Sequence, residues 1–298
     1  MASKPRHKAR TRPAARTQIV MLGTGTPRPD PARSGPATAL VVNGIPYLID
    51  FGPGVVRRMT AAYERGMDAF GVAATALKTV FLTHLHADHT AGYPDLIFTP
   101  WILGRRRPLD VYGPKGLRAM TRHVLKAWAI DLEDRVTGID RLPRDGCQVN
   151  AHEIAPGAVY ADRNIRVTAF PVRHGNLAAF GFRFETPDRV VVISGDTAPT
   201  PSLAEHCEGC DVLIHEAYSH RTYRQVSPKW QRYRRSHHTS AKELAALARR
   251  VRPRLLVLYH RSNAGGAAPL VDAEQQLLKE MRRLYRGPIV AGHDLDVF

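Results

Sequence analysis

Four potential metal ligands lie within six residues in the order His84-Leu-His86-Ala-Asp88-His89. Imidazole nitrogens and a carboxylate are ligands that suit a borderline divalent ion such as zinc. The apolar run Thr79–Leu82 precedes them, and residues two apart in a strand share a face, so His84 and His86 can point the same way. Asp88 and His89 then fall where the chain turns into the next element. One short segment can therefore offer ligands to two neighbouring ions.

Three later residues of ligand type follow apolar, strand-like runs: His174 after Phe170-Pro-Val-Arg, Asp196 in Ile193-Ser-Gly-Asp, and His260 after Val257-Leu-Tyr. Runs of this kind would place the three side chains at the edge of a β-core, as a site built there requires. Taken singly, Asp196 is also compatible with a turn aspartate, His174 with a loop histidine and His260 with a residue that caps a strand.

These seven positions together resemble the signature of the metallo-β-lactamase superfamily, and the match extends from Gln18 to Phe298. Within it, Ile214-His-Glu-Ala217 and His238-Thr-Ser240 are most similar to the ribonuclease Z branch. The resemblance implies the α/β class and an αββα sandwich, with two sheets face to face and helices outside. We see no linker that divides it. The expected domains are a disordered basic arm at 1–17 and one hydrolase domain at 18–298.

The resemblance also implies a ligand set, in which one ion takes His84, His86 and His174, the other takes Asp88, His89 and His260, and Asp196 bridges them. Because all ligands are nitrogen or oxygen, two Zn²⁺ ions are expected, with Mn²⁺ or Fe as alternatives. Two such ions lower the pKa of water and neutralise charge on the substrate, so the expected reaction is hydrolysis without an organic cofactor.

Glu216 and His238 are the catalytic pair that the ribonuclease Z resemblance implies, and Asp88 is the ligand whose loss should abolish turnover. The glutamate would orient the histidine, whose imidazolium form near pH 7 would protonate the leaving oxygen. His237 is the alternative, but His238 directly precedes Thr-Ser as in the family. Asp50, at the end of a neighbouring strand, is a candidate acceptor for a ligand histidine, the alternative being a turn or cap residue.

The net charge of +16 and the pI of about 10.3 favour a polyanionic partner, although a solvated basic surface would give the same values. Residues 217–242 contain no acid. We expect there a loop near the active site whose cations grip phosphates while its rings stack on bases; the alternative is a solvated loop with the rings packed inward. Its cations and rings are Arg221, Arg224, Lys229, Arg232, Arg234 and Arg235, with Tyr218, Tyr223, Trp230 and Tyr233. Arg105–Arg107 is expected to be a plain surface turn.

A phosphodiester is therefore the expected substrate, with 3′ processing of tRNA precursors as the specific version. Two features of ribonuclease Z are missing: Pro31–Pro36 lacks its Pro-x-Lys-x-Arg-Asn pattern, and Phe180–Glu185 leads through Thr186-Pro-Asp188 into the next strand without a long Gly-rich arm. An arylsulfatase-like or small-molecule phosphodiesterase and a glyoxalase II- or lactonase-like hydrolase stay open. So does a nucleic-acid-binding protein with a vestigial metal site, although the complete ligand set argues against it.

The apolar runs and the cysteines of the chain indicate its cellular compartment. No run approaches the ~20 apolar residues that span a bilayer, and no apolar segment follows the basic N-terminus, so neither a membrane anchor nor a secretory signal is expected. Three cysteines are too few for a disulfide framework. Cys207-x-x-Cys210 is expected to be a pair of reduced structural thiols in a reducing cytoplasm. Because related enzymes are often dimers, a homodimer is a further alternative that the family resemblance implies.

The elements that must position these residues are read from apolar periodicity and turn residues. Asn43-Gly44 predicts a hairpin, and Ser240 with Glu243 predicts a capped helix start. A helical segment at 91–103 is expected to be interrupted at Pro94 and Pro100. Strands are expected at 18–22, 38–42, 47–51, 79–83, 109–112, 147–154, 165–172, 179–185, 189–194, 211–215 and 254–259, and helices from 55 and at 117–130, 241–251 and 271–285.

Overall fold

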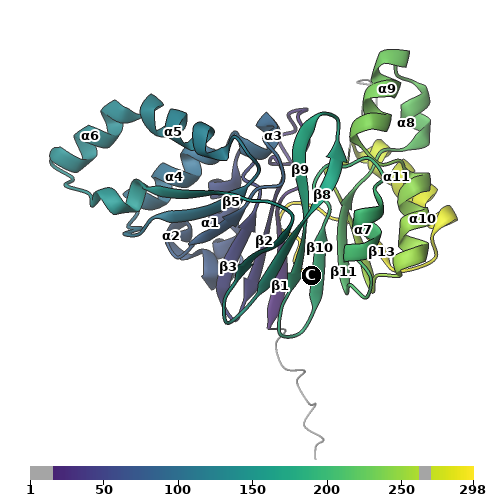
Figure 1. The fold of residues 1–298 in the computed structure, drawn as a ribbon, viewed down its shortest axis with the longest axis horizontal. Helices are drawn as coiled ribbons and strands as arrows, with labels where there is room; N and C mark the ends of the chain where they lie inside the picture. The colour runs from purple at the N-terminus through teal and green to yellow at the C-terminus, as the bar shows by residue number, and fades with distance from the viewer. Residues whose placement is uncertain (1–15, 262–269) are drawn as a thin grey trace, which may run out of the picture.

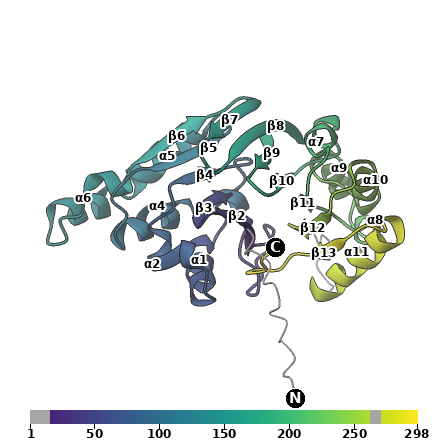
Figure 2. The same cartoon turned by 90° about the horizontal axis from the view of Figure 1, so that it is seen from below.

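The computed structural model describes residues 16–261 and 270–298. Two β-sheets lie face to face at the centre of the molecule, and helices cover both outer faces (Figures 1 and 2). This is the αββα sandwich that the sequence predicts. Of the predicted basic arm, residues 1–15 lie outside the described residues, and the first strand already begins at Thr17.

The first sheet has the order β1-β2-β3-β4-β5-β6. Strands β1 to β3 are antiparallel neighbours, and β3 to β6 run parallel. The predicted hairpin joins β2 to β3, with Asn43 and Gly44 at φ 50° and 78°. The strands are β1 Thr17–Gly23, β2 Ala37–Val42, β3 Ile45–Ile49, β4 Thr79–Phe81, β5 Leu109–Gly113 and β6 Val149–Glu153.

The second sheet has the order β13-β12-β11-β10-β9-β8-β7. Strands β10 to β13 are parallel, whereas β7 to β10 are antiparallel. The connection from β9 to β10 is short, as the sequence predicts. It consists of Thr186–Asp188 and the residue that follows. The strands are β7 Gly157–Ala161, β8 Arg166–His174, β9 Leu177–Glu185, β10 Val190–Ile193, β11 Val212–Glu216, β12 Leu255–Tyr259 and β13 Ile289–Ala291.

The helices divide between the two outer faces in chain order (Figure 2). On the side of the first sheet are α1 Val55–Glu64, α2 Gly71–Ala74, α3 Ala87–Thr90, α4 Tyr93–Ile102, α5 Leu117–Ala127 and α6 Ala129–Thr137, with short 3₁₀ turns at Asp68–Phe70 and Arg144–Cys147. On the side of the second sheet are α7 Pro201–His206, α8 His220–Arg224, α9 Pro228–His237, α10 Ala241–Val251 and α11 Leu270–Leu284. No helix of the described residues combines the length and the apolar character needed to span a membrane.

Alternation along the strands produces three apolar layers. In β1, Ile19 and Met21 pack between the sheets, while Val20 and Leu22 face the helices of the first half. In β11, Ile214 enters the layer between the sheets, whereas Leu213 packs against α10 and α11. Strands buried on both faces can hold their ends rigidly, and those ends carry the candidate ligands.

Helix α4 departs from the prediction because it continues through Pro100. A proline removes one N–H, and so leaves the carbonyl four residues earlier, that of Leu96, without its helical partner. The Arg105 guanidinium donates to this carbonyl at 3.1 Å and to that of Ile97 at 2.6 Å. Arg105 is therefore 1% exposed, and the expectation that Arg105–Arg107 is a plain surface turn is wrong for this residue.

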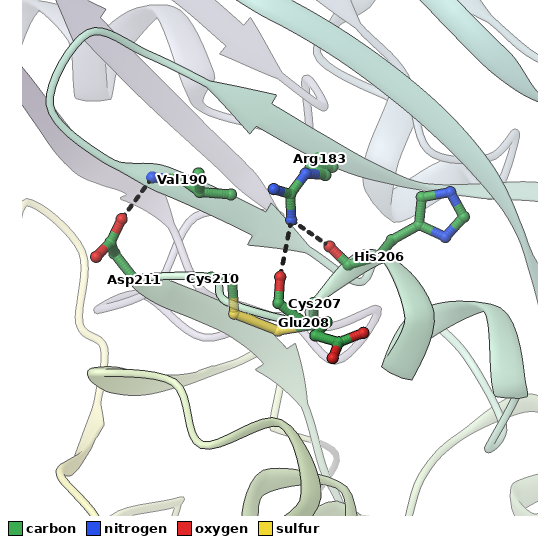
Figure 3. Close-up of a disulfide and its surroundings, with 7 residues drawn as sticks. All are labelled: Arg183, Val190, His206, Cys207, Glu208, Cys210 and Asp211. Carbon is green, nitrogen blue, oxygen red and sulfur yellow. Dashed lines mark hydrogen bonds between the residues drawn. A yellow bond between two sulfur atoms is a disulfide. The ribbon is translucent and has the colours of Figure 1, made fainter.

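Cysteines 207 and 210 also correct a prediction, because they form a disulfide rather than two thiols (Figure 3). The pair closes the turn between α7 and β11, with the two Cα atoms 5.1 Å apart. Arg183 donates to the carbonyls of His206 and Glu208 in the same turn. Both cysteines are buried in the layer between the second sheet and its helices.

Several further elements were not predicted. Strand β7 continues the sheet beyond β8, and the expected helix at 117–130 is two helices that break at Trp128. The expected loop between Glu216 and His238 contains the helices α8 and α9. The predicted capping box is present, since Ser240 accepts from the Glu243 N–H and Glu243 accepts from the Ser240 N–H.

Candidate metal centre and catalytic pair

Both sheets contribute to one cluster of histidines and aspartates. His84 and His86 follow β4, and Asp88 and His89 lie on the short helix α3. From the second sheet come His174 at the end of β8, Asp196 after β10, and His260 after β12. The structure thus brings together all seven residues that the sequence singled out as ligands.

The first group joins His84, His86 and His174. Nδ1 of His86 lies 3.1 Å from Nε2 of His84 and 3.0 Å from Nε2 of His174. Three ring nitrogens that converge in this way can hold one divalent ion.

The second group joins Asp88, His89 and His260. Oδ2 of Asp88 lies 3.0 Å from Nε2 of His260 and 3.7 Å from Nε2 of His89. Asp196 stands between the groups, with Oδ1 at 3.5 Å from Nε2 of His89 and Oδ2 at 4.0 Å from Nε2 of His174. A carboxylate in this position can contact ions in both groups.

Unpaired buried atoms show that the cluster suits a cation. Nε2 of His89, Oδ1 of Asp196 and Nδ1 of His260 are buried and have no hydrogen-bond partner among the described residues. Leaving such groups unpaired is costly, and a metal ion would satisfy them. The donor set of nitrogens and oxygens fits a divalent ion of the zinc, manganese or iron type.

The pKa values of the candidate ligand histidines differ between the two groups. Burial lowers the pKa of His84 well below its usual value and that of His174 to about 4, which keeps both rings neutral, as a ligand must be. Burial alone would also lower the pKa of His89 and His260. Asp196, with Asp50 beside His89 and Asp88 beside His260, outweighs burial and raises both pKa values. These two rings thus lie in an anionic environment that favours a cation.

Neighbouring groups fix the tautomers of three candidate ligands. His89 donates from Nδ1 to Asp50 at 2.8 Å, and Asp50 also accepts from the N–H and hydroxyl of Thr83. His84 Nδ1 lies 3.0 Å from the Thr83 hydroxyl, and His174 Nδ1 lies 2.8 Å from the carbonyl of His237. Nε2 of each ring is therefore left for a metal.

Two of these residues adopt a backbone conformation that non-glycine residues rarely take. Asp50 has φ 59° and His260 has φ 42°. The left-handed region costs about 1–2 kcal/mol for such residues, and the surrounding packing must offset this cost. Strain of this kind is common at sites where a side chain must point in one direction.

Glu216 and His238 meet beside the metal ligands. His238 Nδ1 donates to Oε1 of Glu216 at 3.1 Å, and the same oxygen accepts from the backbone N–H groups of Thr197 and Thr239. The His238 ring centre lies 5.3 Å from that of His174 and 6.2 Å from that of His260. His237 instead stacks on Tyr233, with ring centres 4.0 Å apart. The geometry therefore pairs the carboxylate with His238 and not with His237.

Burial sets the charge of this pair. Burial, followed by the charge of Asp196, raises the pKa of Glu216 well above its usual value. Burial lowers the pKa of His238 to about 4. The imidazolium that the sequence argument assumed near pH 7 is thus disfavoured in the free protein, and a nearby anion would be needed to raise the pKa of His238.

The basic segment between the pair is only partly as predicted. Arg234 is 1% exposed, with its guanidinium 5.3 Å from the ring centre of Tyr218, so it does not present its charge to solvent. Tyr218 is buried, and Trp230 is 51% exposed. The other cations of α8 and α9 that were predicted to grip phosphates are largely exposed: Arg221, Arg224, Lys229, Arg232 and Arg235.

Sequence reasoning missed the residues that orient the ligands and the glutamate. Thr83 directly precedes the histidine motif and could have been suspected from that position. The carbonyl of His237 and the N–H groups of Thr197 and Thr239 carry no sequence signal, because any residue type supplies them.

A family model described as the β-lactamase superfamily domain matches residues 47–261. A ribonuclease Z of Mycobacterium bovis (strain BCG / Pasteur 1173P2) is 31% identical over 282 residues, which cover 93% of this chain and 96% of that protein. A ribonuclease Z of Mycobacterium sp. (strain KMS) is 34% identical over 248 residues, covering 82% of this chain and 83% of that protein.

Solved structures are similar over nearly the whole chain. The metallo-β-lactamase fold protein YhfI from Bacillus subtilis has a TM-score of 0.72 at 17% identity and covers 95% of this chain and 98% of its own. The short form of human tRNase Z has a TM-score of 0.67 at 22% identity, with 94% and 98% covered. At these identities the similarity establishes the fold.

Proposed function

Because the chain belongs to the β-lactamase superfamily and, within it, to the ribonuclease Z-like proteins, we propose that it is a dinuclear zinc phosphodiesterase that processes the 3′ ends of tRNA precursors. The observation that carries the proposal is the hydrogen bond from His238 to Glu216 beside a complete seven-residue ligand cluster. The relatives named ribonuclease Z support RNA as the substrate.

The proposed ligands divide into His84, His86 and His174 for one ion and Asp88, His89 and His260 for the other, with Asp196 shared. Zinc suits this nitrogen and oxygen set, with manganese or iron as alternatives. Bound ions would polarise the scissile ester and lower the pKa of water. Asp50, Thr83 and the His237 carbonyl hold the rings in the tautomer that leaves Nε2 to the metal.

His238 is proposed to protonate the leaving oxygen. The Glu216 carboxylate fixes Nδ1 of the ring, so the proton for the substrate would be carried on Nε2. An incoming phosphodiester brings negative charge next to the ring and raises its pKa from the low value of the free protein. Binding of substrate would therefore charge the acid at the point where it is needed.

A second candidate function is an arylsulfatase-like or small-molecule phosphodiesterase. The observation that favours it is the short connection Thr186–Asp188 between β9 and β10, where no arm extends to hold a large RNA. A thioesterase or lactonase would use the same ligand cluster but has no evident need of the Glu216–His238 pair.

A panel of small substrates separates these functions. Metal-loaded protein is assayed on bis(p-nitrophenyl) phosphate, p-nitrophenyl sulfate, a thioester and a lactone, with Asp88→Ala as the blank. Cleavage of the diester that disappears in the variant supports the phosphodiesterase. Sulfate cleavage without diester cleavage, or turnover of only the thioester or lactone, would refute it.

A further inference from the structure

A basic hollow of about 440 Å³ lies between α8 and α11, outside the ligand cluster. Its walls carry three guanidinium groups, from Arg221, Arg224 and Arg283, together with His220, two glutamines and the carboxylate of Glu280. We call this the arginine hollow. On α8 the two arginines are three residues apart, and Glu280 and Arg283 have the same spacing on α11, so each helix presents one face to the hollow.

Glu280 is the one acid among the described residues that line the arginine hollow, and it is already engaged. Glu280 accepts from the hydroxyl of Ser219 at 2.8 Å and from the backbone N–H of His220 at 3.1 Å. These bonds fix the start of α8 to α11. Over residues 16–261 and 274–298, no acidic side chain forms an ion pair with Arg221, Arg224 or Arg283. The arginine hollow thus holds an excess of positive charge on a defined support.

The backbone connects the arginine hollow to the catalytic pair. Tyr218 donates from its N–H to the carbonyl of Thr239 and accepts from the N–H of Ala241, so the segments next to Glu216 and His238 are held together. Arg221 is five residues after Glu216, which limits their Cα separation to about 18 Å. A polymer whose scissile bond lies at the catalytic pair can therefore reach the arginine hollow.

We infer that the arginine hollow binds backbone phosphates of the RNA substrate away from the scissile bond, an inference that rests on the proposed function. Guanidinium groups bind phosphate oxygens in pairs of parallel hydrogen bonds, and three of them in one hollow suit several phosphates in succession. The β9–β10 connection is too short to form an RNA-holding arm, so a grip on RNA has to come from other parts of the chain, and the arginine hollow offers one such surface. The lining of the arginine hollow contains none of the candidate ligands and neither Glu216 nor His238, so a small diester bound at the ligand cluster should gain nothing from it.

The test compares a triple variant, Arg221→Gln, Arg224→Gln and Arg283→Gln, with a control that loses the same charge elsewhere. The control is Arg106→Gln, Arg107→Gln and Arg122→Gln, three exposed arginines on the side of the first sheet. Metal-loaded proteins are compared for binding of a fluorescent 3′-extended tRNA precursor over a range of salt, and for turnover of that RNA and of bis(p-nitrophenyl) phosphate.

We expect the triple variant to bind the RNA at least ~10-fold more weakly than the control, with the slope of log Kd against log salt reduced by about two to three. Turnover of bis(p-nitrophenyl) phosphate should stay within about twofold of wild type, as should circular dichroism and melting temperature. The single variant Arg283→Gln, on α11 alone, should show a smaller loss in the same direction.

RNA binding equal to that of the control would overturn the inference, and so would a parallel loss of small-diester turnover. The proposed function fails in a different way. If wild-type protein cleaves neither the RNA nor the diester, that function is wrong, while the binding comparison still decides whether the arginine hollow recognises RNA.

Discussion

Asp50 and His89 are joined by a hydrogen bond of 2.8 Å between Oδ2 and Nδ1, with both side chains buried. Asp50 stands at the end of β3 with φ 59°, and it also accepts from the backbone and hydroxyl of Thr83, whose hydroxyl contacts His84. One carboxylate thus orients a candidate ligand in each metal group. From the sequence, Asp50 was expected to accept from a ligand histidine, with a turn or cap residue as the alternative.

Replacement of Asp50 by asparagine should weaken metal binding. The amide cannot accept all the bonds that the carboxylate accepts, so the His89 ring loses its fixed tautomer. Affinity for zinc should fall by about 10–100-fold, measured by competition with a chromophoric chelator. Asp68→Asn, at an exposed aspartate of the 3₁₀ turn Asp68–Phe70, is the control and should bind zinc as wild type does. Equal affinities in the two variants would contradict the role of Asp50.

The Glu216–His238 pair predicts a dependence on the leaving group. His238→Gln should lower kcat on RNA by about 10²–10⁴-fold, because the leaving alkoxide then lacks its acid. Turnover of bis(p-nitrophenyl) phosphate should fall much less, because p-nitrophenolate leaves without a proton. Glu216→Gln, which retains an oxygen acceptor for Nδ1, should lie between wild type and His238→Gln. Equal losses on both substrates would rule out general acid catalysis by His238.

Adding a single methyl group at Gly175 should affect turnover. It has φ 60°, and a Cβ there would lie 2.1 Å from Nε2 of His237, whose carbonyl holds His174. Gly175→Ala should displace the end of α9 and reduce turnover by at least ~10-fold, since errors near 1 Å in positioning are costly. Gly44 has φ 78°, and no atom of the described residues lies within 4 Å of a Cβ placed there. Gly44→Ala should cost about 1 kcal/mol of stability with normal turnover. If Gly175→Ala and Gly44→Ala have equal turnover rates, the hydrogen bond between His174 and the carbonyl of His237 does not matter for activity.

Asp162 predicts a pH-dependent contribution to stability. Burial would raise its pKa, but hydrogen bonds from the Tyr47 hydroxyl and the N–H groups of Ile165 and Asn164 outweigh burial and lower the pKa. The unfolded chain therefore binds the proton more readily, and the stabilisation is present above the unfolded pKa of about 3.9 and is lost as the pH falls through the folded value.

Asp162→Asn should accordingly destabilise the protein by about 1 kcal/mol at pH 7, a modest value because the carboxylate is exposed. The difference from wild type should shrink below about pH 4. Urea unfolding at several pH values measures it, again with Asp68→Asn for comparison. A difference that stays constant with pH would show that the carboxylate charge is not the cause.

The strands and the first four ligands were predictable because their signals are local, whereas the sandwich and the later ligands His174, Asp196 and His260 followed from the family resemblance. His84 to His89 lie in one continuous motif, and the buried strands read as apolar runs. What escaped prediction depends on tertiary partners. In helix α4, the carbonyl of Leu96 that Pro100 leaves without a helical partner accepts from Arg105, and no spacing rule reveals that contact.

The basic segment shows a second limit of the sequence argument. Its charges were evident, but the burial of Arg234 against Tyr218 follows from the packing of α8 and α9. The bond between Cys207 and Cys210 likewise depends on the turn that brings them together and not on the number of cysteines.

The central claim is a two-metal site that cleaves RNA, and Asp88→Ala tests it most directly. Asp88 lies within 4 Å of both His89 and His260, so its loss should empty or weaken one ion site without unfolding the protein. We predict about two metal ions per chain in wild type and about one in the variant, with cleavage of a 3′-extended tRNA precursor lowered by at least ~10³-fold. Two ions and undiminished cleavage in Asp88→Ala, with a normal fold by circular dichroism, would contradict the account.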